Sequence, residues 1–335
     1  MELKELSPAE FNDFVSIETT NNFLQSSYAF SRYKNKNQEA YLLGLVKNQK
    51  ILAAALVVKI RELKGKKVFS APGGPILNYE LKTFPETFKF FVKELKVFLK
   101  NKSGSVLQIS PNIKYEKTLA ETLKSNHFKE LGEYIQCKWI STLDLSKFSS
   151  ESELLSSFRK GHRYSVKYSS SRYHLEIREL KFDELKILKD LSNKSAKKHA
   201  FSDQPLTYYE EMFTAFKDKI KVLAAFYENT PISAAMFIIY GNEIVYLYSG
   251  SDPEYNKYCG PFALQWEMMT YALKNKIPRY NFYGVKPFDG DGVYEFKRGF
   301  RAETEELAGT FMLPLDAFGK LYTLKHKYHK YSEVA

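Results

Sequence analysis

The sequence predicts an α/β protein made of two units of one type, each with a mixed sheet flanked by helices. Two observations lead to this prediction. The chain has 335 residues, which is the length of two domains of ordinary size. The order of a strand meander, a helix and a further strand also occurs twice, at about half-chain spacing. Such a pattern indicates two similar domains rather than a solenoid.

The first unit is expected to span residues 1–145. Ser7, followed by Pro8 and Glu10, marks the start of a capped helix, because a hydroxyl side chain there satisfies free backbone N–H groups. The later elements are expected as strands at 40–47, 51–60 and 67–71, a helix at 83–100, a strand at 105–110, a helix at 114–125 and a strand at 139–145. The first three strands form an antiparallel meander.

The second unit is expected to span residues 146–312, and a helix within 313–335 is expected to return and pack on the first unit. Its elements are expected as helices at 150–158 and 159–172, a strand at 174–180, helices at 182–198 and 205–217, strands at 220–227, 232–240 and 243–249, a helix at 261–275 and a strand at 279–283. Each unit therefore contains a meander that a helix connects to one more strand.

The composition indicates a cytoplasmic protein. Hydrophobic residues make up 44% of the chain and charged residues 27%, and no apolar run approaches the roughly 18 residues of a membrane helix. The first residues, MELKELSPAEF, lack the basic and then apolar regions of an export signal. Cys137 and Cys259 are too few for a disulfide framework, and neither has metal-ligand spacing around it. We therefore expect no metal and no cofactor.

An excess of positive charge favours an anionic partner. Lys and Arg number 50 against 39 Asp and Glu, which leaves a net charge of +11. In RKGHRYSVKYSSSR, Arg159, Arg163 and Lys167 recur every fourth residue, and no acid lies between 154 and 175. Helical spacing places these three cations on one face. A phosphate backbone is one interpretation of this face, and a solvated surface helix is the other.

Two junctions that contain glycine do not fit a phosphate-binding loop. Gly73 and Gly74 follow a strand but lack the Lys-Ser or Lys-Thr of a nucleotide-phosphate loop. They predict either a tight turn or the close approach of another backbone. At the start of the helix expected at 261–275, only Gly260 is present, and Pro261 has no N–H to donate. The pyrophosphate of coenzyme A is therefore poorly accommodated.

The stretch YNFYGVKPFDGDGVYEFKRGF, residues 280–300, contains the leading candidate for chemistry. Gly284 ends the strand, the Asp-Gly repeat predicts a mobile loop, and VYEFKRGF predicts a short turn that points Lys297 toward the strand ends. A cation there could stabilise the negative charge that develops on an attacked carbonyl, and the alternative is an ordinary surface lysine. Tyr246 and Tyr248, on a neighbouring strand, are expected to share one face. No Ser-His-Asp set, Cys-His pair or carboxylate pair is apparent, and the six histidines occupy ordinary settings.

Several segments of the chain together carry a family resemblance. They are PGGPILNY, RKGHRYSVKYSSSR, FSDQPLTYYEEMF, NKYCGPFALQWEMMTYA, and RYNFYGV followed by GVYEFKRGF and ELAGTF. Collinear over nearly the whole chain, they resemble the Fem (FemABX) family of aminoacyltransferases, which build the interpeptide bridge of peptidoglycan. The resemblance implies two tandem acetyltransferase-like (GNAT-like) units. It also implies transfer of an amino acid from aminoacyl-tRNA to the stem peptide of a cell-wall precursor.

The resemblance implies roles for particular residues. Phe296 and Lys297 stand in the place of a Phe-Lys pair near the transferred acyl group. Lys34 stands where the family has a lysine that contacts precursor phosphates. Tyr208 and Tyr248 match tyrosines that line the precursor groove.

The chain also departs from the family pattern. Gln204 stands where some members have a phosphate-binding Arg, and Ser110 stands where some have Asp; both remain candidates for precursor binding. Certain members insert a long helical hairpin between the strands expected at 220–227 and 232–240. Only residues 228–231 intervene here, so that coiled-coil arm is expected to be absent.

An aminoacyl ester on tRNA is already activated, so the enzyme has to bring it to an amine, remove a proton and stabilise the oxyanion. We expect Lys297 to supply the cation and Lys34 to bind the diphosphate. Arg159, Arg163 and Lys167 are expected to contact tRNA, and the base is substrate or water. The expected form is a monomer that contacts the inner membrane face peripherally. Two alternatives stay open: an acyl-CoA-dependent N-acyltransferase of GNAT type, and a non-catalytic protein that binds RNA or the envelope.

Overall fold

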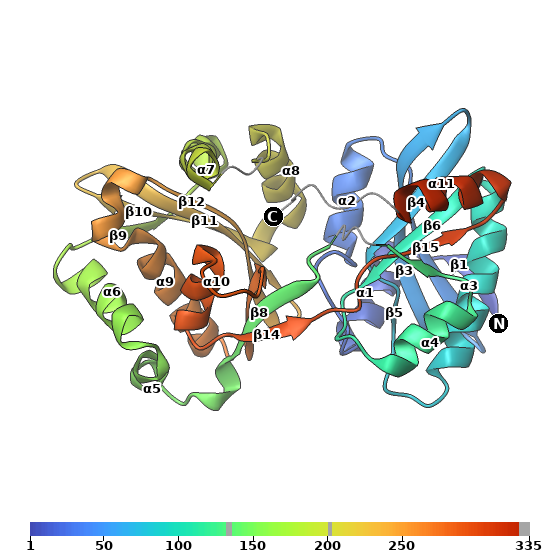
Figure 1. Ribbon diagram of the computed structural model, residues 1–335, viewed down its shortest axis with the longest axis horizontal. Coiled ribbons are helices and arrows are strands. Elements are labelled where there is room, and N and C mark those ends of the chain that lie inside the picture. The colour runs from blue at the N-terminus through green and yellow to red at the C-terminus, as the bar shows by residue number, and fades with distance from the viewer. Residues whose placement is uncertain (132–135, 200–202, 328–335) are drawn as a thin grey trace. The chain divides into compact units, whose positions relative to one another are not determined.

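The computed structural model describes residues 1–131, 136–199 and 203–327. By its internal contacts the chain divides into two compact units (Figure 1). Within the described residues, the first unit contains Met1–Lys138 and residues 306–327, and the second contains Trp139–Glu305. Each unit has a mixed sheet with helices beside it, so the predicted α/β class is confirmed.

The first unit is built on a sheet in the order β1-β2-β3-β4-β6-β15-β7, with β5 beside β3. The strands are β1 (Glu2–Glu5), β2 (Ala40–Lys47), β3 (Lys50–Leu63), β4 (Lys66–Gly73), β5 (Ile76–Leu77), β6 (Gly104–Pro111), β7 (Lys129–Glu130) and β15 (Phe311–Pro314). The helices are α1 (Pro8–Ile17), α2 (Ser27–Asn35), α3 (Phe84–Asn101), α4 (Lys117–Ser125) and α11 (Ala317–Lys327). Only β4 and β6 pair in parallel among the described strand pairs of this sheet, because α3 carries the chain back between them.

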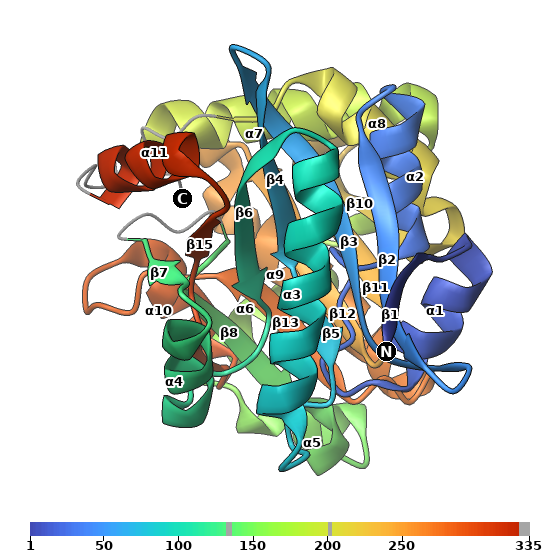
Figure 2. The same cartoon turned by 90° about the vertical axis from the view of Figure 1, so that its right-hand side faces the viewer.

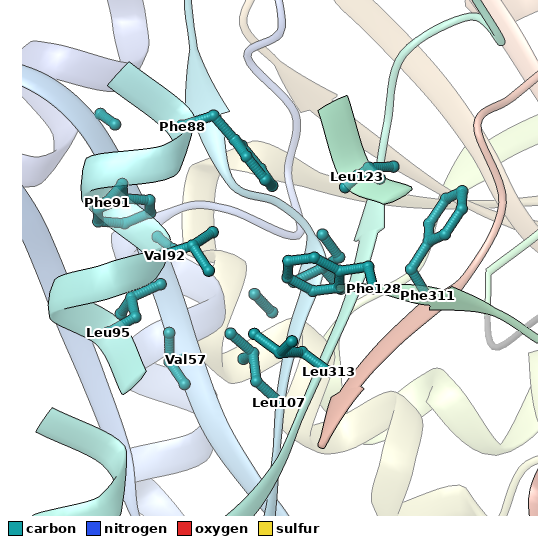
Figure 3. Packing of buried hydrophobic residues seen from close by; sticks show 14 of the residues in the cluster. Val57, Phe88, Phe91, Val92, Leu95, Leu107, Leu123, Phe128, Phe311 and Leu313 are labelled. Atoms are coloured by element: carbon teal, nitrogen blue, oxygen red, sulfur yellow. The ribbon is translucent and has the colours of Figure 1, made fainter. Parts of the chain in front are cut away.

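The main core of the first unit lies between its sheet and α3, which lies in front of the strands in Figure 2. Phe88, Phe91 and Leu95 recur at helical spacing, so they form one buried face of α3. Figure 3 shows these side chains against Val57 of β3 and Leu107 of β6. β3 is buried on both faces along its centre, which is why its sequence there is a continuous apolar run.

The second unit is built on a sheet in the order β14-β8-β13-β12-β11-β10-β9. The strands are β8 (Trp139–Asp144), β9 (Glu176–Glu179), β10 (Ile220–Tyr227), β11 (Thr230–Tyr240), β12 (Glu243–Ser251), β13 (Arg279–Gly284) and β14 (Glu303–Glu306). The α-helices are α5 (Glu151–Ser157), α6 (Lys160–Ser171), α7 (Leu185–His199), α8 (Leu206–Phe216), α9 (Gly260–Lys274) and α10 (Gly292–Gly299). Short 3-10 helices are η1 (Leu145–Lys147), η2 (Phe182–Glu184), η3 (Lys217–Lys219) and η4 (Pro253–Tyr258). Figure 1 places α7 on one side of this sheet and α5, α6 and α9 on the other.

The strand at 139–144 belongs to the second sheet, although the sequence assigned it to the end of the first unit. β8 pairs antiparallel with β13, where Thr142 lies opposite Asn281 and Asp144 opposite Arg279. The corresponding place in the first sheet, beside β6, is taken by β15 from near the end of the chain. The boundary therefore falls between Lys138 and Trp139 rather than after residue 145.

The two units repeat one order of elements. In the first, β4, α3 and β6 form a parallel crossover, and α4 and β7 follow. In the second, β12, α9 and β13 form the crossover, and α10 and β14 follow. α10 therefore occupies the place in the second unit that α4 occupies in the first.

The closing helix expected within 313–335 begins at Ala317, and residues 328–335 lie outside the described part of the chain. No helix in the described part combines the length and apolar character that a membrane crossing requires.

We expect Gly250→Ala to destabilise the second unit. A Cβ on Gly250 would lie 2.1 Å from the backbone nitrogen of Ser192 and 2.2 Å from the carbonyl carbon of Leu191. These are backbone atoms of α7, which cannot move as a side-chain tip can. The free energy of unfolding in urea should fall by about 1–3 kcal/mol.

The matched control for this change is Gly161→Ala in α6. No atom lies within 4 Å of the position of its Cβ, and alanine favours a helix over glycine by about 0.5–1 kcal/mol. This control should be neutral or stabilising. A Gly250→Ala protein as stable as the wild type would contradict the close packing of α7 on β12.

Candidate functional site

The Asp-Gly repeat caps a helix. The Asp291 side chain accepts the backbone N–H of Tyr294 at 2.7 Å, so it satisfies one of the free donors at the start of α10. Gly290, before it, has a φ of 94°, which favours glycine. The segment predicted as a short turn is therefore the helix Gly292–Gly299, and Phe296 and Lys297 both belong to it.

Lys297 is a buried residue rather than a surface lysine. Its relative exposure is 5%. Its Nζ donates a hydrogen bond to the carbonyl of Gly284, the last residue of β13. The prediction that this side chain points to the strand ends is therefore confirmed. Water screens the positive charge of a buried ammonium group less than that of an exposed one, so its interaction with a nearby negative charge is stronger.

The backbone is irregular just before Gly284. The pairing of β13 with β8 shifts between Asn281 and Gly284, which is the mark of a bulge. Within the bulge, Tyr283 has a φ of 63°, a conformation that is strained for a bulky side chain. The Asn281 side chain accepts the Tyr283 N–H at 2.8 Å and supports this turn of the chain. The carbonyl that holds Lys297 thus follows directly on a strained residue.

Gly299 lets the ring of His162 pack directly against α10. A Cβ on Gly299 would lie 1.9 Å from His162 Cε1, so a larger residue would displace the imidazole. His162 Nε2 lies 2.8 Å from the carbonyl oxygen of Phe296, and the neutral ring donates the bond from this atom. Its ring also meets Phe262 and Phe300 edge-on, at centroid distances of 5.0 and 4.7 Å. The expectation of an ordinary setting for this histidine is therefore wrong, since it joins α6 to the helix that carries Lys297.

Burial lowers the pKa of His162 below its ordinary value. The hydrogen bond to Phe296 acts in the opposite direction, and the positive charge of Arg159 adds to the lowering. The neutral imidazole is thus the form that the folded protein prefers.

Two of the three cations expected to contact tRNA have partners within the second unit. Arg159 Nη1 forms an ion pair with Glu295 of α10 at 3.1 Å. Arg163 Nη1 donates to the carbonyls of Phe158 and Ser156, at 2.6 and 3.2 Å, at the C-terminal end of α5. Lys167 is exposed. The sequence could place these residues on one helix face, but it could not show that the face meets other elements at Arg159 and Arg163.

Tyr208 and Tyr248 lie together, on α8 and β12. Tyr248 Oη donates to Tyr208 Oη at 3.1 Å, and the two rings meet edge-on at 5.6 Å. Burial, with the nearby Tyr208, raises the pKa of Tyr248 far above its ordinary value, so its hydroxyl stays protonated. Tyr283 is close enough to add to this shift. The tyrosine pair therefore belongs to the same end of the sheet as the Gly284 carbonyl.

Tyr246 and Tyr248, expected on one face of their strand, lie on opposite faces of the sheet because a bulge falls between them. The register with β11 shifts so that Tyr246 lies opposite Phe237 and Tyr248 opposite Met236. The extra residue reverses the alternation of side chains along β12. Tyr246 consequently packs in the core with Phe237 and Phe282, whereas Tyr248 meets Tyr208.

Gln204 follows an anchored residue. Asp203 accepts hydrogen bonds from Lys189 Nζ at 2.6 Å and from Tyr209 Oη at 2.6 Å, and Ser192 Oγ donates to it as well. Burial would raise the pKa of Asp203, but these bonds outweigh burial and lower it. Lys189 also donates to the backbone carbonyl of Gln204 at 2.6 Å. The loop that carries Gln204 is thereby tied to α7.

In the first unit, Gly73 and Gly74 allow two side chains to approach closely. A Cβ would lie 2.4 Å from Asn22 Oδ1 at Gly73, where φ is 73°, and 2.7 Å from Gln25 Cδ at Gly74. Asn22 donates to the Gly73 carbonyl, and Gln25 donates to the carbonyls of neighbouring strands. The PGGP segment therefore fixes the start of α2, the helix on which Lys34 is exposed.

Ser110 belongs to a buried polar row in the first sheet. It is 3% exposed, and its hydroxyl has no hydrogen-bond partner among the described residues. Gln108, two residues earlier on β6, and Ser70, opposite it on β4, also have unpaired polar atoms there. Buried polar atoms of this kind usually find a partner, so the row is a candidate for ligand contact. Gln108 and Ser70 carry no motif, and sequence reasoning missed them.

The start of α9 is shaped by packing. A Cβ on Gly260 would lie 2.9 Å from the Cβ of Ser233 on β11, so glycine is needed for this contact.

Among the described residues, no group of three or more His, Cys, Asp or Glu side chains is arranged to hold a metal ion.

Comparison with known proteins identifies related chains. The sequence model of the FemAB family matches residues 6–131, 123–228 and 221–327. The aminoacyltransferase FemA of Staphylococcus epidermidis is 24% identical to this chain over 409 aligned positions, which cover 94% of the chain and 96% of FemA. The FemA of Staphylococcus aureus strain N315 gives the same identity and coverage. The alignment is longer than the 335 residues here, so these relatives contain segments that this chain lacks.

Solved structures share the fold. A crystal structure of FemX superposes with a TM-score of 0.85 at 17% identity and covers 97% of this chain and 99% of FemX. A tandem GNAT protein from the clavulanic acid biosynthesis pathway superposes with a TM-score of 0.59 at 8% identity, over 94% of this chain and 98% of that one. The second likeness confirms the acetyltransferase-like fold predicted for the two units.

We expect Gly299→Ala to destabilise the protein by about 1–3 kcal/mol, because the new methyl group overlaps the His162 ring. The cost should fall when Gly299→Ala is made in a His162→Ala background, since the clash is then absent. A double-mutant cycle on the free energy of unfolding measures this coupling, which we expect between 0.5 and 3 kcal/mol, on the order of that found for residues in contact.

Gly292→Ala is the matched control, because no atom lies within 4 Å of its Cβ position at the start of the same helix. If the cycle gave no coupling between Gly299 and His162, the packing of α6 on α10 through this pair would be refuted.

The stability of the protein should fall in acid partly because of His162. Its pKa in the folded protein lies below the unfolded value of about 6.5, so the unfolded chain binds the proton more readily. The stabilisation is complete above about pH 6.5 and is lost as the pH falls through this value toward the lower folded pKa. Unfolding of the wild type and of His162→Gln should be compared at pH 7.5 and pH 5.5. The wild type should lose more stability than the variant, and an equal loss in both proteins would contradict the assignment.

Proposed function

The chain belongs to the FemAB family, and we propose that it moves an amino acid from aminoacyl-tRNA to the stem peptide of a peptidoglycan precursor. Relatives of this chain are named aminoacyltransferases. The chain is an aminoacyltransferase on this ground, and the precursor, the tRNA and the residues that contact them are the proposal. The observation that carries it within the protein is the burial of Lys297 at the end of β13.

The proposed reaction needs little beyond positioning and charge. The amine of the stem peptide attacks the ester carbonyl, the carbonyl oxygen becomes negative, and the C–O bond to the tRNA ribose then breaks. Lys297 stabilises the negative oxygen through the positive charge of its ammonium group. Phe296 lies beside it on α10 and limits water near the ester. The amine loses its proton to substrate or water, and the leaving ribose oxygen takes up a proton to become a hydroxyl group. Because the amine attacks the ester directly, no covalent intermediate on the protein is invoked.

We propose groups that contact the precursor in each unit taken by itself, and each group is assigned by its own chemistry. Tyr248 stays protonated, and the hydroxyls of Tyr208 and Tyr248 can donate or accept hydrogen bonds along a peptide. Gln204, on its anchored loop, offers an amide to a phosphate or peptide group. In the first unit, the exposed Lys34 binds precursor phosphate, and Ser110 supplies an unpaired hydroxyl.

We assign the attraction of tRNA to the basic segment 159–172. Arg159, Arg163 and Lys167 contribute positive charge there, and no acid lies between 154 and 175. The proposal places the protein in the cytoplasm, where tRNA is aminoacylated, as a monomer. A lipid-linked acceptor would bring it to the inner membrane face.

The proposed function is tested by incubating the full chain with a panel of radiolabelled aminoacyl-tRNAs and with both the nucleotide-linked and the lipid-linked precursor. Label should pass to the precursor from at least one tRNA. Transfer from an acyl-CoA instead, or RNA binding without transfer from any tRNA, would overturn the proposal.

We expect Lys297→Met to lower the transfer rate at saturating substrate by about 100- to 1000-fold. Methionine keeps an unbranched side chain that is one atom shorter and removes the charge, and loss of one oxyanion-stabilising group has an effect of this order. The rate of label transfer is measured together with the affinities for tRNA and for the precursor, which should change little.

Lys274→Met is the matched control, because Lys274 is a surface lysine of the same unit with 70% of its side chain exposed. It should transfer at the wild-type rate. Turnover near the wild-type rate in Lys297→Met, with both substrates bound, would refute the catalytic assignment.

A further inference from the structure

The exposed residues of α6 are not the row Arg159, Arg163 and Lys167 that the sequence indicates. Arg159 and Arg163 bind partners inside the unit. The solvent-exposed residues that recur every fourth position are Lys160, Tyr164, Tyr168 and Arg172. We call these four residues the α6 row. Twelve residues of helix, at about 1.5 Å per residue, make the row about 18 Å long.

The two tyrosines of the α6 row are stacked on each other and accessible. Tyr164 is 47% exposed and Tyr168 is 40% exposed. Their ring centroids lie 5.8 Å apart with an interplanar angle of 27°. Nothing in the core explains two large aromatic side chains here, because the buried face of α6 is formed by Val166 and Ser169.

A cation lies at each end of the tyrosine pair. Lys160 Nζ is 6.0 Å from the centroid of the Tyr164 ring, and the Arg172 guanidinium carbon is 5.8 Å from that of Tyr168. Within the described residues, neither cation forms an ion pair with a carboxylate. The row thus combines aromatic faces with positive charge that no carboxylate of the described residues neutralises by an ion pair.

We propose that the α6 row binds the unpaired nucleotides at the 3′ end of the tRNA, with bases on Tyr164 and Tyr168 and phosphates at Lys160 and Arg172. This inference rests on the proposed function for the identity of the RNA. Base stacking on aromatic rings beside cations is the general mode by which proteins hold single-stranded nucleic acid. A membrane surface fits less well, because such helices present Trp, Phe and Leu to the lipid and the row has none.

The position of the row suits the reaction. The backbone N–H of Arg159, the residue before Lys160, donates to the Gly299 carbonyl at 2.9 Å. Gly299 is two residues beyond Lys297 on α10. Nucleotides held along the row thus lead to the helix that carries the proposed catalytic lysine, and the aminoacyl ester is at the end of those nucleotides.

The test measures binding of the full chain to deacylated tRNA, to the same tRNA with its unpaired 3′ nucleotides removed, and to anionic phospholipid vesicles. The Tyr164→Ala/Tyr168→Ala variant should bind intact tRNA about tenfold or more weakly, because stacking on two rings is lost. Its affinity for the trimmed tRNA should equal that of the wild type. Tyr164→Phe/Tyr168→Phe, which keeps the rings, should bind intact tRNA within about twofold of the wild type.

Two further variants complete the test. Lys160→Gln/Arg172→Gln should reduce the slope of log K against log salt by about 1.4, since each phosphate contact on a single strand contributes about 0.7. Phe182→Ala, which removes another exposed aromatic residue of the same unit, should change none of the affinities. Three results would overturn the inference. Tyr164→Ala/Tyr168→Ala could weaken the binding of intact and trimmed tRNA equally, it could leave both affinities unchanged, or it could abolish only the binding of vesicles.

The outcomes also separate this inference from the proposed function. If the wild type transfers amino acids and the tyrosine variants bind the tRNA end normally, the role of the α6 row is refuted and the proposed function stands. If the wild type binds the tRNA end through the α6 row but transfers no amino acid, the proposed function is refuted and the role of the α6 row stands.

Discussion

The contact between His162 and Gly299 is the constraint on which the proposed site depends. It allows α6 and α10 to approach until the imidazole bonds to the Phe296 carbonyl, with no room for a side chain between them. α10 is a short helix, and short helices are not stable on their own. Its position is instead set by this packing, by its Asp291 cap and by the bond from Lys297 to Gly284. The lysine is therefore held from both sides of its helix.

Irregular pairing in two neighbouring strands prepares the same end of the sheet. The bulge in β12 turns Tyr248 away from the core and toward Tyr208, and the bulge in β13 precedes the Gly284 carbonyl. A regular ladder would have sent Tyr248 to the face that Tyr246 occupies. Strained or irregular backbone is costly, and it persists where the surrounding structure holds it in place. Here it leaves the tyrosine hydroxyl groups, a backbone carbonyl and a buried ammonium at the same end of the sheet.

Periodic segments of the sequence predicted most regular elements closely. The strand expected at 40–47 is β2, and the helix expected at 83–100 is α3, from Phe84 to Asn101. These succeed because a long apolar pattern determines both the type and the buried face of an element. α10 was missed as a helix because its few residues carry too little pattern, although the repeat of α4 in the first unit was a usable sign.

Features that depend on distant parts of the chain were not readable. The assignment of 139–144 to the second sheet depends on pairing with β13, far along the chain. The setting of His162 depends on Gly299, and the faces of Tyr246 and Tyr248 depend on a bulge that no local signal marks. The segment GVYEFKRGF marks Lys297 in the sequence, whereas the burial of its side chain depends on the fold.

Chemical rescue of the lysine tests the central claim most directly. In a chain with Cys137→Ser and Cys259→Ser, which removes both native thiols, Lys297→Cys would be alkylated while unfolded and then refolded. Aminoethylation restores an ammonium group at this position, whereas a neutral reagent of equal length does not. The account predicts that aminoacyl transfer is lost in the cysteine variant and returns only after aminoethylation. Transfer that persists without a positive charge, or returns equally with the neutral group, would contradict it.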